Sequence, residues 1–171
     1  MIYLLNYRHS NSEPLKSITQ LPKEKAFILA NKLYIENPCR AHNRFGSDFE
    51  EYYKNRIEME KWLYNKFISL GGKPKIKNPL YFSLQHSENL YTNFNEGKIV
   101  KIKLDDIPSS VVSFTFDDSM AMFYSSDPIN LFTKSQLFEF ISIHNNCIDS
   151  FLNSIHPQCI YIEAQLWTDI F

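Results

Sequence analysis

The sequence predicts an α+β fold, with helices mainly in the first half and a central antiparallel-type sheet built mainly from the second half. In the first half, apolar residues recur every three or four positions, which is typical of helices packed on one face. After Pro79 they alternate with polar residues, which is typical of strands. No internal repeat, linker or low-complexity run interrupts the sequence, so residues 1–171 are predicted to form a single mixed domain.

Two long helices are expected in the first half. The first follows Pro22, a residue that the first turn of a helix tolerates, and ends before Pro38. The second is predicted to begin at a capping box formed by Ser47 and Glu50 and to stop at the glycines at 71 and 72. Its apolar positions, which we expect to face the core, are Phe49, Tyr52, Tyr53, Ile57, Trp62, Leu63, Phe67 and Leu70.

Strands are expected near the N-terminus and at several places in the second half. The first covers residues 2–6, and alternating patterns follow in PLYFSLQ, KIVKIKL, SVVSFTF and the closing segment CIYIEAQLWTDIF. Short helices are expected over SENLYTNF, over residues 134–145 and over residues 149–155, the second of them opened by a capping box of Thr133 and Gln136. In the closing strand, one face carries Ile160, Ile162, Ala164 and Leu166, and the other carries Tyr161, Glu163, Gln165 and Trp167.

Composition and charge exclude several classes of protein. Hydrophobic residues make up 44% and aromatic residues 15% of the 171 positions, which is too apolar for a disordered chain. The net charge of −1 gives no overall attraction to nucleic acid or to an anionic membrane, and no apolar run is long enough to span a membrane. The three cysteines, Cys39, Cys147 and Cys159, lack metal-site spacing and suit free thiols. We therefore expect a cytoplasmic protein with no metal and no membrane partner.

Glu163 is the candidate catalytic residue. It lies on the polar face of the closing strand among aromatic neighbours, where a carboxylate is costly unless it is solvated, paired or used in chemistry. The alternative is a glutamate on a solvent-exposed face of the sheet.

Candidate binding residues come from three other segments. Tyr81 and Ser83 lie two residues apart on one strand face, where their hydroxyl groups could bind a ribose or a carboxamide. His9 follows the first strand, and Arg40 and Arg44 lie in the connector CRAHNRFG; such side chains suit an anion, because guanidinium groups match phosphates. The alternatives are an ordinary half-exposed strand for the hydroxyl groups, and helix capping or pairing with nearby glutamates for the arginines.

The commonest signatures of nucleotide-binding, hydrolase and metalloprotease sites are absent. The sequence contains no Walker loop, no GxGxxG, no GxSxG and no HExxH. Alternating lysines in GGKPKIKNP and KIVKIKL predict either a local basic patch or a sheet edge protected by charge.

Three segments of the second half, in order, resemble the ADP-ribosyltransferase fold, and specifically its DarT-like branch of nucleic-acid-modifying toxins. PLYFSLQHSENLY is similar to a strand and short helix of that branch, IVKIKLDDIPSSVVSFTFDDSMA to a strand pair with an Asp-rich connector, and YIEAQLW to the late strand that carries the catalytic glutamate. The chain departs from the family pattern at His9, which no threonine follows, and in the long helix predicted over residues 47–70. The whole chain also resembles a group of bacterial proteins that share an RF, a GG-KP-PLYF and a YIE-Q-W signature.

This resemblance implies an enzyme that uses NAD to modify a nucleic acid or protein target, with a role in toxin action or phage defence. Glu163 would stabilise the positive charge that develops on the ribose as nicotinamide leaves. The alternative is a non-catalytic binding or regulatory domain on the same fold, and the acceptor and the oligomeric state stay open. The resemblance assigns the groups of NAD to the candidates already named: nicotinamide to Tyr81, the ribose or carboxamide to Ser83 and His9, and the pyrophosphate to Arg40 or Arg44.

Overall fold

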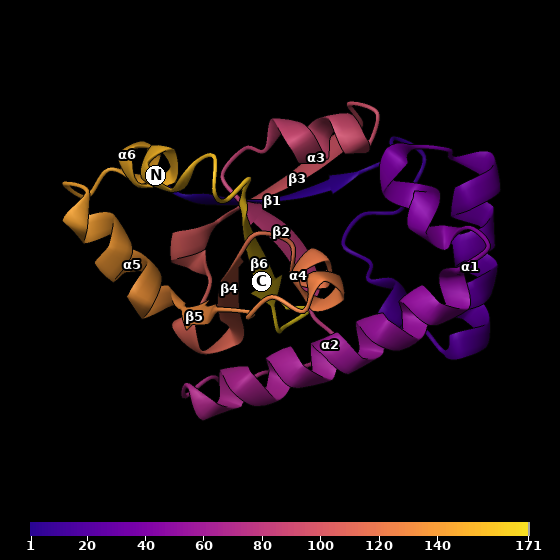
Figure 1. Ribbon diagram of the computed structural model, residues 1–171, viewed down its shortest axis with the longest axis horizontal. Coiled ribbons are helices and arrows are strands. Elements are labelled where there is room, and N and C mark those ends of the chain that lie inside the picture. Colours follow the sequence, from indigo (N-terminus) through magenta and orange to yellow (C-terminus); the bar gives the residue numbers. More distant parts are fainter. Residues whose placement is uncertain (171) are drawn as a thin grey trace.

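The computed structural model describes residues 1–170 and shows an α+β architecture (Figure 1). Its six-stranded sheet is antiparallel at every strand pair, which confirms the predicted fold class. The strand order is β3-β1-β2-β6-β4-β5, so strands from the two ends of the chain are close neighbours. The strands are β1 (Tyr3–Arg8), β2 (Leu80–Leu84), β3 (Lys98–Lys103), β4 (Val112–Phe116), β5 (Leu131–Thr133) and β6 (Ile162–Leu166).

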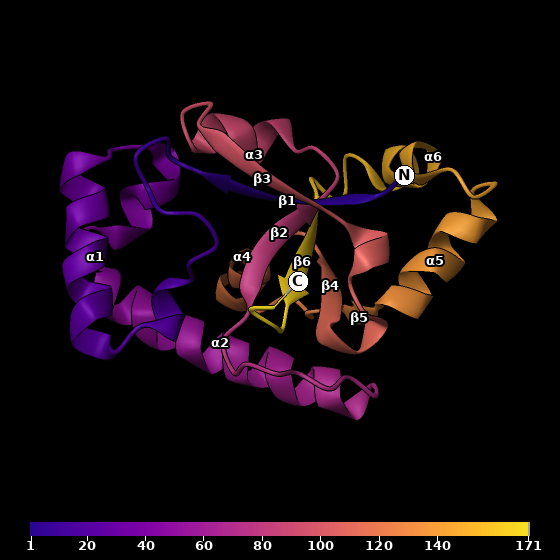
Figure 2. The same cartoon turned by 180° about the vertical axis from the view of Figure 1, so that it is seen from behind.

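The helices surround this sheet. In both views α5 and α6 lie to one side of the strands and α1 lies to the opposite side (Figures 1 and 2). The two longest helices precede β2 as predicted, and the four shorter ones lie between the later strands. Within the described part of the chain, no helix is both long and apolar enough to cross a membrane. The helices are α1 (Lys23–Glu36), α2 (Phe49–Ser69), α3 (Glu88–Asn93), α4 (Ser119–Ser125), α5 (Lys134–Ile143) and α6 (Ile148–Ile155).

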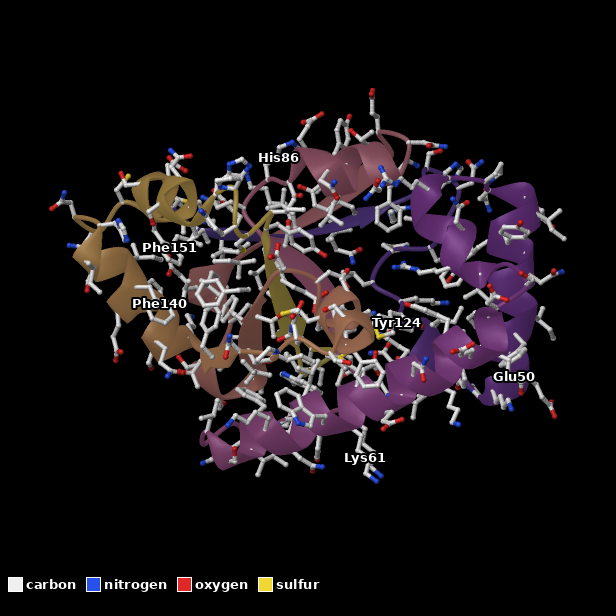
Figure 3. The ribbon with its side chains drawn as sticks, viewed as in Figure 1. Glu50, Lys61, His86, Tyr124, Phe140 and Phe151 are labelled. Carbon is white, nitrogen blue, oxygen red and sulfur yellow. The ribbon has the colours of Figure 1, made fainter. Side chains whose placement is uncertain are left out.

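One face of the sheet is apolar and packs against α5 and α6. Because side chains alternate along each strand, the register places a row of apolar residues across four neighbouring strands. Phe140 of α5 and Phe151 of α6 lie over this face with their ring centroids 6.0 Å apart (Figure 3). The row consists of Phe82, Ala164, Phe114 and Phe132.

The opposite face carries polar side chains that are nevertheless buried. The same register aligns Ser83 with Glu163 and Glu163 with Thr115, so these three residues form a row across the middle of the sheet. Apolar side chains of α2 and α4 pack beside this face around Trp167, and they exclude water from much of it. This covered polar face positions the candidate site.

The buried face of α2 differs from the predicted one. Trp62 is 43% exposed, Leu70 37% and Ile57 36%, so the prediction that these three residues face the core is wrong. Arg56 and Glu60 occupy the buried face instead, one helical turn apart, and their opposite charges pair with each other. The residues that α2 buries are Phe49, Arg56, Met59, Glu60, Leu63 and Phe67.

One of the two predicted capping boxes forms. Thr133 Oγ1 accepts a hydrogen bond from the backbone N–H of Gln136, and Gln136 Oε1 accepts one from the backbone N–H of Thr133. The capping box predicted for Ser47 is wrong, because Asp48 precedes the first residue of α2 and no side chain caps the helix. The connector before it forms a 3₁₀ helix over Arg40–Phe45, and α2 begins at Phe49, two residues past Ser47. Gly71, with a φ of +90°, adopts the left-handed conformation expected after the end of α2.

Candidate functional site

A cavity of about 360 Å³ opens on the polar face of the sheet. This volume lies within the range of small-molecule sites in proteins. Its walls come from β1, β2, β6, α1, α2 and the 3₁₀ helix Arg40–Phe45, so segments from both ends of the chain build it. Its charged and hydroxyl-bearing lining includes Arg8, Arg44, Arg56, Tyr81, Ser83, Asp118, Tyr161 and Glu163.

The cavity brings together four of the predicted site residues. Glu163, Tyr81, Ser83 and Arg44 all contribute to its lining. They come from β6, β2 and the 3₁₀ helix, and strand pairing places Ser83 directly beside Glu163. Their convergence on one concave surface follows from the sheet order, in which β2 and β6 are neighbours.

His9 and Arg40 do not line the cavity. β1 ends at Arg8, so His9 begins the following loop, where its ring lies 6.0 Å from that of His42. Arg40 opens the 3₁₀ helix and is exposed. Since that helix has about three residues per turn, residues 40 and 44 lie on different sides of it, and only Arg44 reaches the cavity.

Glu163 is buried, with 4% of its surface exposed, which rules out the alternative of a solvent-exposed glutamate. Its Oε1 accepts hydrogen bonds from Ser119 Oγ at 2.5 Å and from Gln165 Nε2 at 2.9 Å. Among residues 1–170, no donor forms a hydrogen bond with its other oxygen, Oε2. One oxygen is therefore held by the protein, and the other is left for a ligand in the cavity.

The surroundings of Glu163 raise its pKa toward neutral pH. Burial raises the pKa of Glu163 to about 7, and the nearby Asp118 carboxylate adds to the rise. The Arg56 guanidinium and the hydrogen bonds from Ser119 and Gln165 act on this pKa in the opposite direction. The carboxyl group can therefore exchange a proton close to pH 7, as general acids and bases do.

A chain of buried hydrogen bonds orients Gln165, which in turn holds Glu163. Trp167 Nε1 donates to Ser113 Oγ at 2.8 Å, and Ser113 Oγ donates to Gln165 Oε1 at 2.8 Å. The Gln165 amide nitrogen then donates to Thr115 Oγ1 at 3.0 Å and to Glu163. Sequence reasoning did not single out Gln165 as a functional residue, although its position two residues after Glu163 places both on one strand face.

A buried ion pair forms a further wall of the site. Arg56 Nε donates to Glu60 Oε1 at 2.8 Å, and the Arg56 guanidinium lies 3.7 Å from the centroid of the Tyr81 ring. The Tyr81 hydroxyl donates to the same Glu60 oxygen at 3.1 Å, and Asn78 Nδ2 donates to Glu60 Oε2 at 2.7 Å. Arg56 therefore covers one face of the Tyr81 ring. The i,i+4 spacing of Arg56 and Glu60 was the available signal for this pair, but it is equally common on exposed helix surfaces.

Cationic and anionic groups both line the cavity. Arg8 and Arg44 provide guanidinium groups, and the Nε atom of Arg8 is buried without a hydrogen-bond partner in the described part of the chain. Asp118 lies with Tyr161, whose hydroxyl donates to Asp118 Oδ2 at 3.0 Å. A ligand that carries both phosphate groups and a positive charge would match such a lining. Across residues 1–170, no group of three or more His, Cys, Asp and Glu side chains could hold a metal ion.

Comparison with known proteins gives one weak similarity. A stretch of 92 residues is 27% identical to part of a putative F-box protein from Arabidopsis thaliana. The match covers 53% of this chain but only 21% of the plant protein, so the chain spans about a fifth of that relative's length. No family model matches the chain, and no solved structure matches it.

Proposed function

We propose that this protein is an ADP-ribosyltransferase-like enzyme that uses NAD to modify a nucleic acid or protein target. The observation that carries the proposal is the setting of Glu163, which is buried in a cavity with one carboxylate oxygen held and the other free. Glu163 is also the residue to which the sequence resemblance gives the catalytic role. Tyr81, Ser83 and Arg44 share the cavity with it, as the resemblance requires.

The proposed reaction transfers ADP-ribose from NAD to an acceptor. The bond between nicotinamide and the ribose carbon breaks, and its electron pair leaves with nicotinamide. The ribose carbon becomes an oxocarbenium ion, which a lone pair of the acceptor attacks, and the acceptor then loses its proton. Ionised Glu163 would stabilise the oxocarbenium ion through Oε2.

The remaining cavity residues suit the other parts of NAD. Arg8 and Arg44 provide guanidinium groups for the two phosphates, which such groups bind through paired hydrogen bonds. Tyr81, which lines the cavity, would contact nicotinamide through its ring. The Ser83 hydroxyl donates to the Gln85 carbonyl oxygen at 2.7 Å, and its own oxygen can still accept a hydrogen bond from a ribose hydroxyl.

A non-catalytic binding or regulatory domain is the second candidate. His9, to which the resemblance gives a ligand contact, lies outside the cavity lining, and no threonine follows it. The plant relative is named as a putative F-box protein, and that name gives no enzymatic activity. These observations favour a cavity that binds a ligand without converting it.

Binding and turnover of NAD by wild type and Glu163→Gln separate the two candidates. Calorimetry measures binding, and chromatography measures the nicotinamide that is released. We expect both proteins to bind NAD and the variant to release nicotinamide at least about 100-fold more slowly, because it lacks the negative charge. Glu58→Gln, which removes a charge at an exposed position of α2, is the matched control and should behave as wild type.

Each other outcome has a clear meaning. Binding without nicotinamide release from wild type would favour the non-catalytic domain, and absence of NAD binding would exclude the proposed enzyme. Mass spectrometry of nucleic acid and protein from cells that express wild type or Glu163→Gln would identify the acceptor. A cytoplasmic role in toxin action or phage defence belongs to the same proposal, and it predicts that wild type slows bacterial growth whereas Glu163→Gln does not.

A further inference from the structure

The ion pair of Arg56 and Glu60 is buried at an unusual place. Arg56 is 8% exposed and Glu60 is fully buried, although the next residue, Lys61, projects from α2 into solvent (Figure 3). α2 therefore has an exposed surface on which charges would cost nothing. A buried ion pair is generally no more stabilising than apolar side chains of the same volume. The position of this pair therefore calls for a role other than stability.

The two partners differ in how their hydrogen-bonding groups are used. Both carboxylate oxygens of Glu60 are engaged, since Oε1 accepts from Arg56 and Tyr81 and Oε2 accepts from Asn78. The five N–H groups of a guanidinium exceed what Arg56 uses: Nε donates to Glu60, and Nη1 lies 3.5 Å from the Tyr52 hydroxyl. No further hydrogen bond of Arg56 is formed within residues 1–170. Arg56 thus keeps unused donors and a positive charge at the wall of the cavity.

The groups around Glu163 act on its charge in opposite directions. Asp118, at the start of α4, opposes ionisation of Glu163, whereas Arg56, from α2, favours it. The neighbouring phenols of Tyr81, on β2, and Tyr161, which precedes β6, stay neutral, because burial raises the pKa of each well above its ordinary value. Ser119 and Gln165 supply uncharged donors. Arg56 is the cation among these groups, and its position brings it to the same part of the site: its guanidinium lies over the ring of Tyr81, two residues from the Ser83 that pairs with Glu163, and Arg56 and Glu163 line the same cavity.

We propose that Arg56 is a positioning residue that favours the ionised form of Glu163 in the cavity, and that Glu60 restrains this effect by holding the guanidinium against Tyr81. The catalytic consequence rests on the proposed function, because an oxocarbenium ion needs the ionised form of Glu163. The effect of Arg56 on the ionisation of Glu163 does not itself depend on NAD.

The test is a titration of the glutamate side-chain carbons by ¹³C NMR in the ligand-free protein, with the signal of Glu163 assigned by its loss in Glu163→Gln. Arg56→Gln should move the titration midpoint of Glu163 upward by about one pH unit or more, the size typical of a close opposite charge. Glu60→Gln should move it downward, since removal of that negative charge leaves the Arg56 cation uncompensated. Glu58→Gln, at an exposed position of the same helix, should leave it unchanged.

A double variant keeps the test valid if a single variant fails to fold. Each single change leaves one buried charge unpaired, whereas Arg56→Gln with Glu60→Gln removes both charges together. The double variant should melt close to wild type. It should still raise the Glu163 midpoint, because only Arg56 of the two lines the cavity, but by less than Arg56→Gln alone, because loss of the Glu60 charge acts in the opposite direction. An unchanged midpoint in the folded double variant would overturn the proposal.

The outcomes also separate this inference from the proposed function. A raised midpoint in Arg56→Gln, together with no release of nicotinamide by wild type, would support the effect of Arg56 on Glu163 and reject the proposed enzymatic activity. Release of nicotinamide by wild type with the same pH profile in Arg56→Gln would support the enzyme and reject the role of Arg56. If both hold, Arg56→Gln should shift the acid limb of the rate profile upward by the amount seen in the NMR titration.

Discussion

Glu163→Gln should change how stability depends on pH. Burial and the Asp118 carboxylate raise the pKa of Glu163 to about 7, compared with 4.5 for an ordinary glutamate. At about 1.4 kcal/mol for each pKa unit, this difference corresponds to about 3 kcal/mol of folding free energy. The group is buried, so solvent does not screen this effect as it would at the surface.

The sign follows from which state binds the proton. Below pH 4 the carboxyl group is largely protonated in both states. As the pH rises, the unfolded chain releases the proton first, and the folded protein keeps it until the pH passes about 7. The wild type should therefore lose about 2–3 kcal/mol relative to Glu163→Gln between pH 5 and pH 8.

Urea unfolding of both proteins at several pH values measures this difference. Groups that titrate alike in the two proteins cancel in the comparison. The expected difference in unfolding free energy corresponds to roughly 5–10 °C in melting temperature for a chain of this size. A difference that does not vary with pH would show that Glu163 does not titrate in this range. A slope of the opposite sign would show that the attraction of Arg56 outweighs burial, which would refute the reasoning.

Three further predictions concern packing, capping and thiol reactivity. Trp167→Ala should cost about 3–5 kcal/mol of unfolding free energy, because the side chain is fully buried, whereas Trp62→Ala should cost less than about 1 kcal/mol; equal costs in urea unfolding would contradict this. Thr133→Ala should cost about 1 kcal/mol through loss of the capping box, and Ser47→Ala, where no cap forms, should melt within about 0.5 kcal/mol of wild type. Cys147 is exposed, and a hydrogen bond from Ser150 lowers its pKa, so it should react with a thiol reagent in the folded protein; rapid reaction of the two buried cysteines as well would refute the packing around them.

Structural features that depend on residues close together in the sequence were predictable from the sequence. The alternation in PLYFSLQ, KIVKIKL and SVVSFTF correctly places β2, β3 and β4, because successive side chains of a strand point to opposite faces. The capping box at Thr133 and the end of α2 before Gly71 also follow from local backbone chemistry. Alternation likewise placed Glu163 on the polar face of β6, which selected it as a candidate without showing that it is buried.

Only the tertiary structure decided what lies against these elements. Helical periodicity does not state which face of α2 packs inward, so it missed the buried positions of Arg56 and Glu60 and wrongly placed Trp62 in the core. The pairing of β6 between β2 and β4 surrounds Glu163, and a hydrogen bond to Ser119, 44 residues earlier, holds one of its oxygens. The protonation of Glu163 and its place in the cavity arise from groups that approach one another only when the chain folds. A pattern of neighbouring residues cannot specify such contacts, because their energies depend on distance in space and on the exclusion of water.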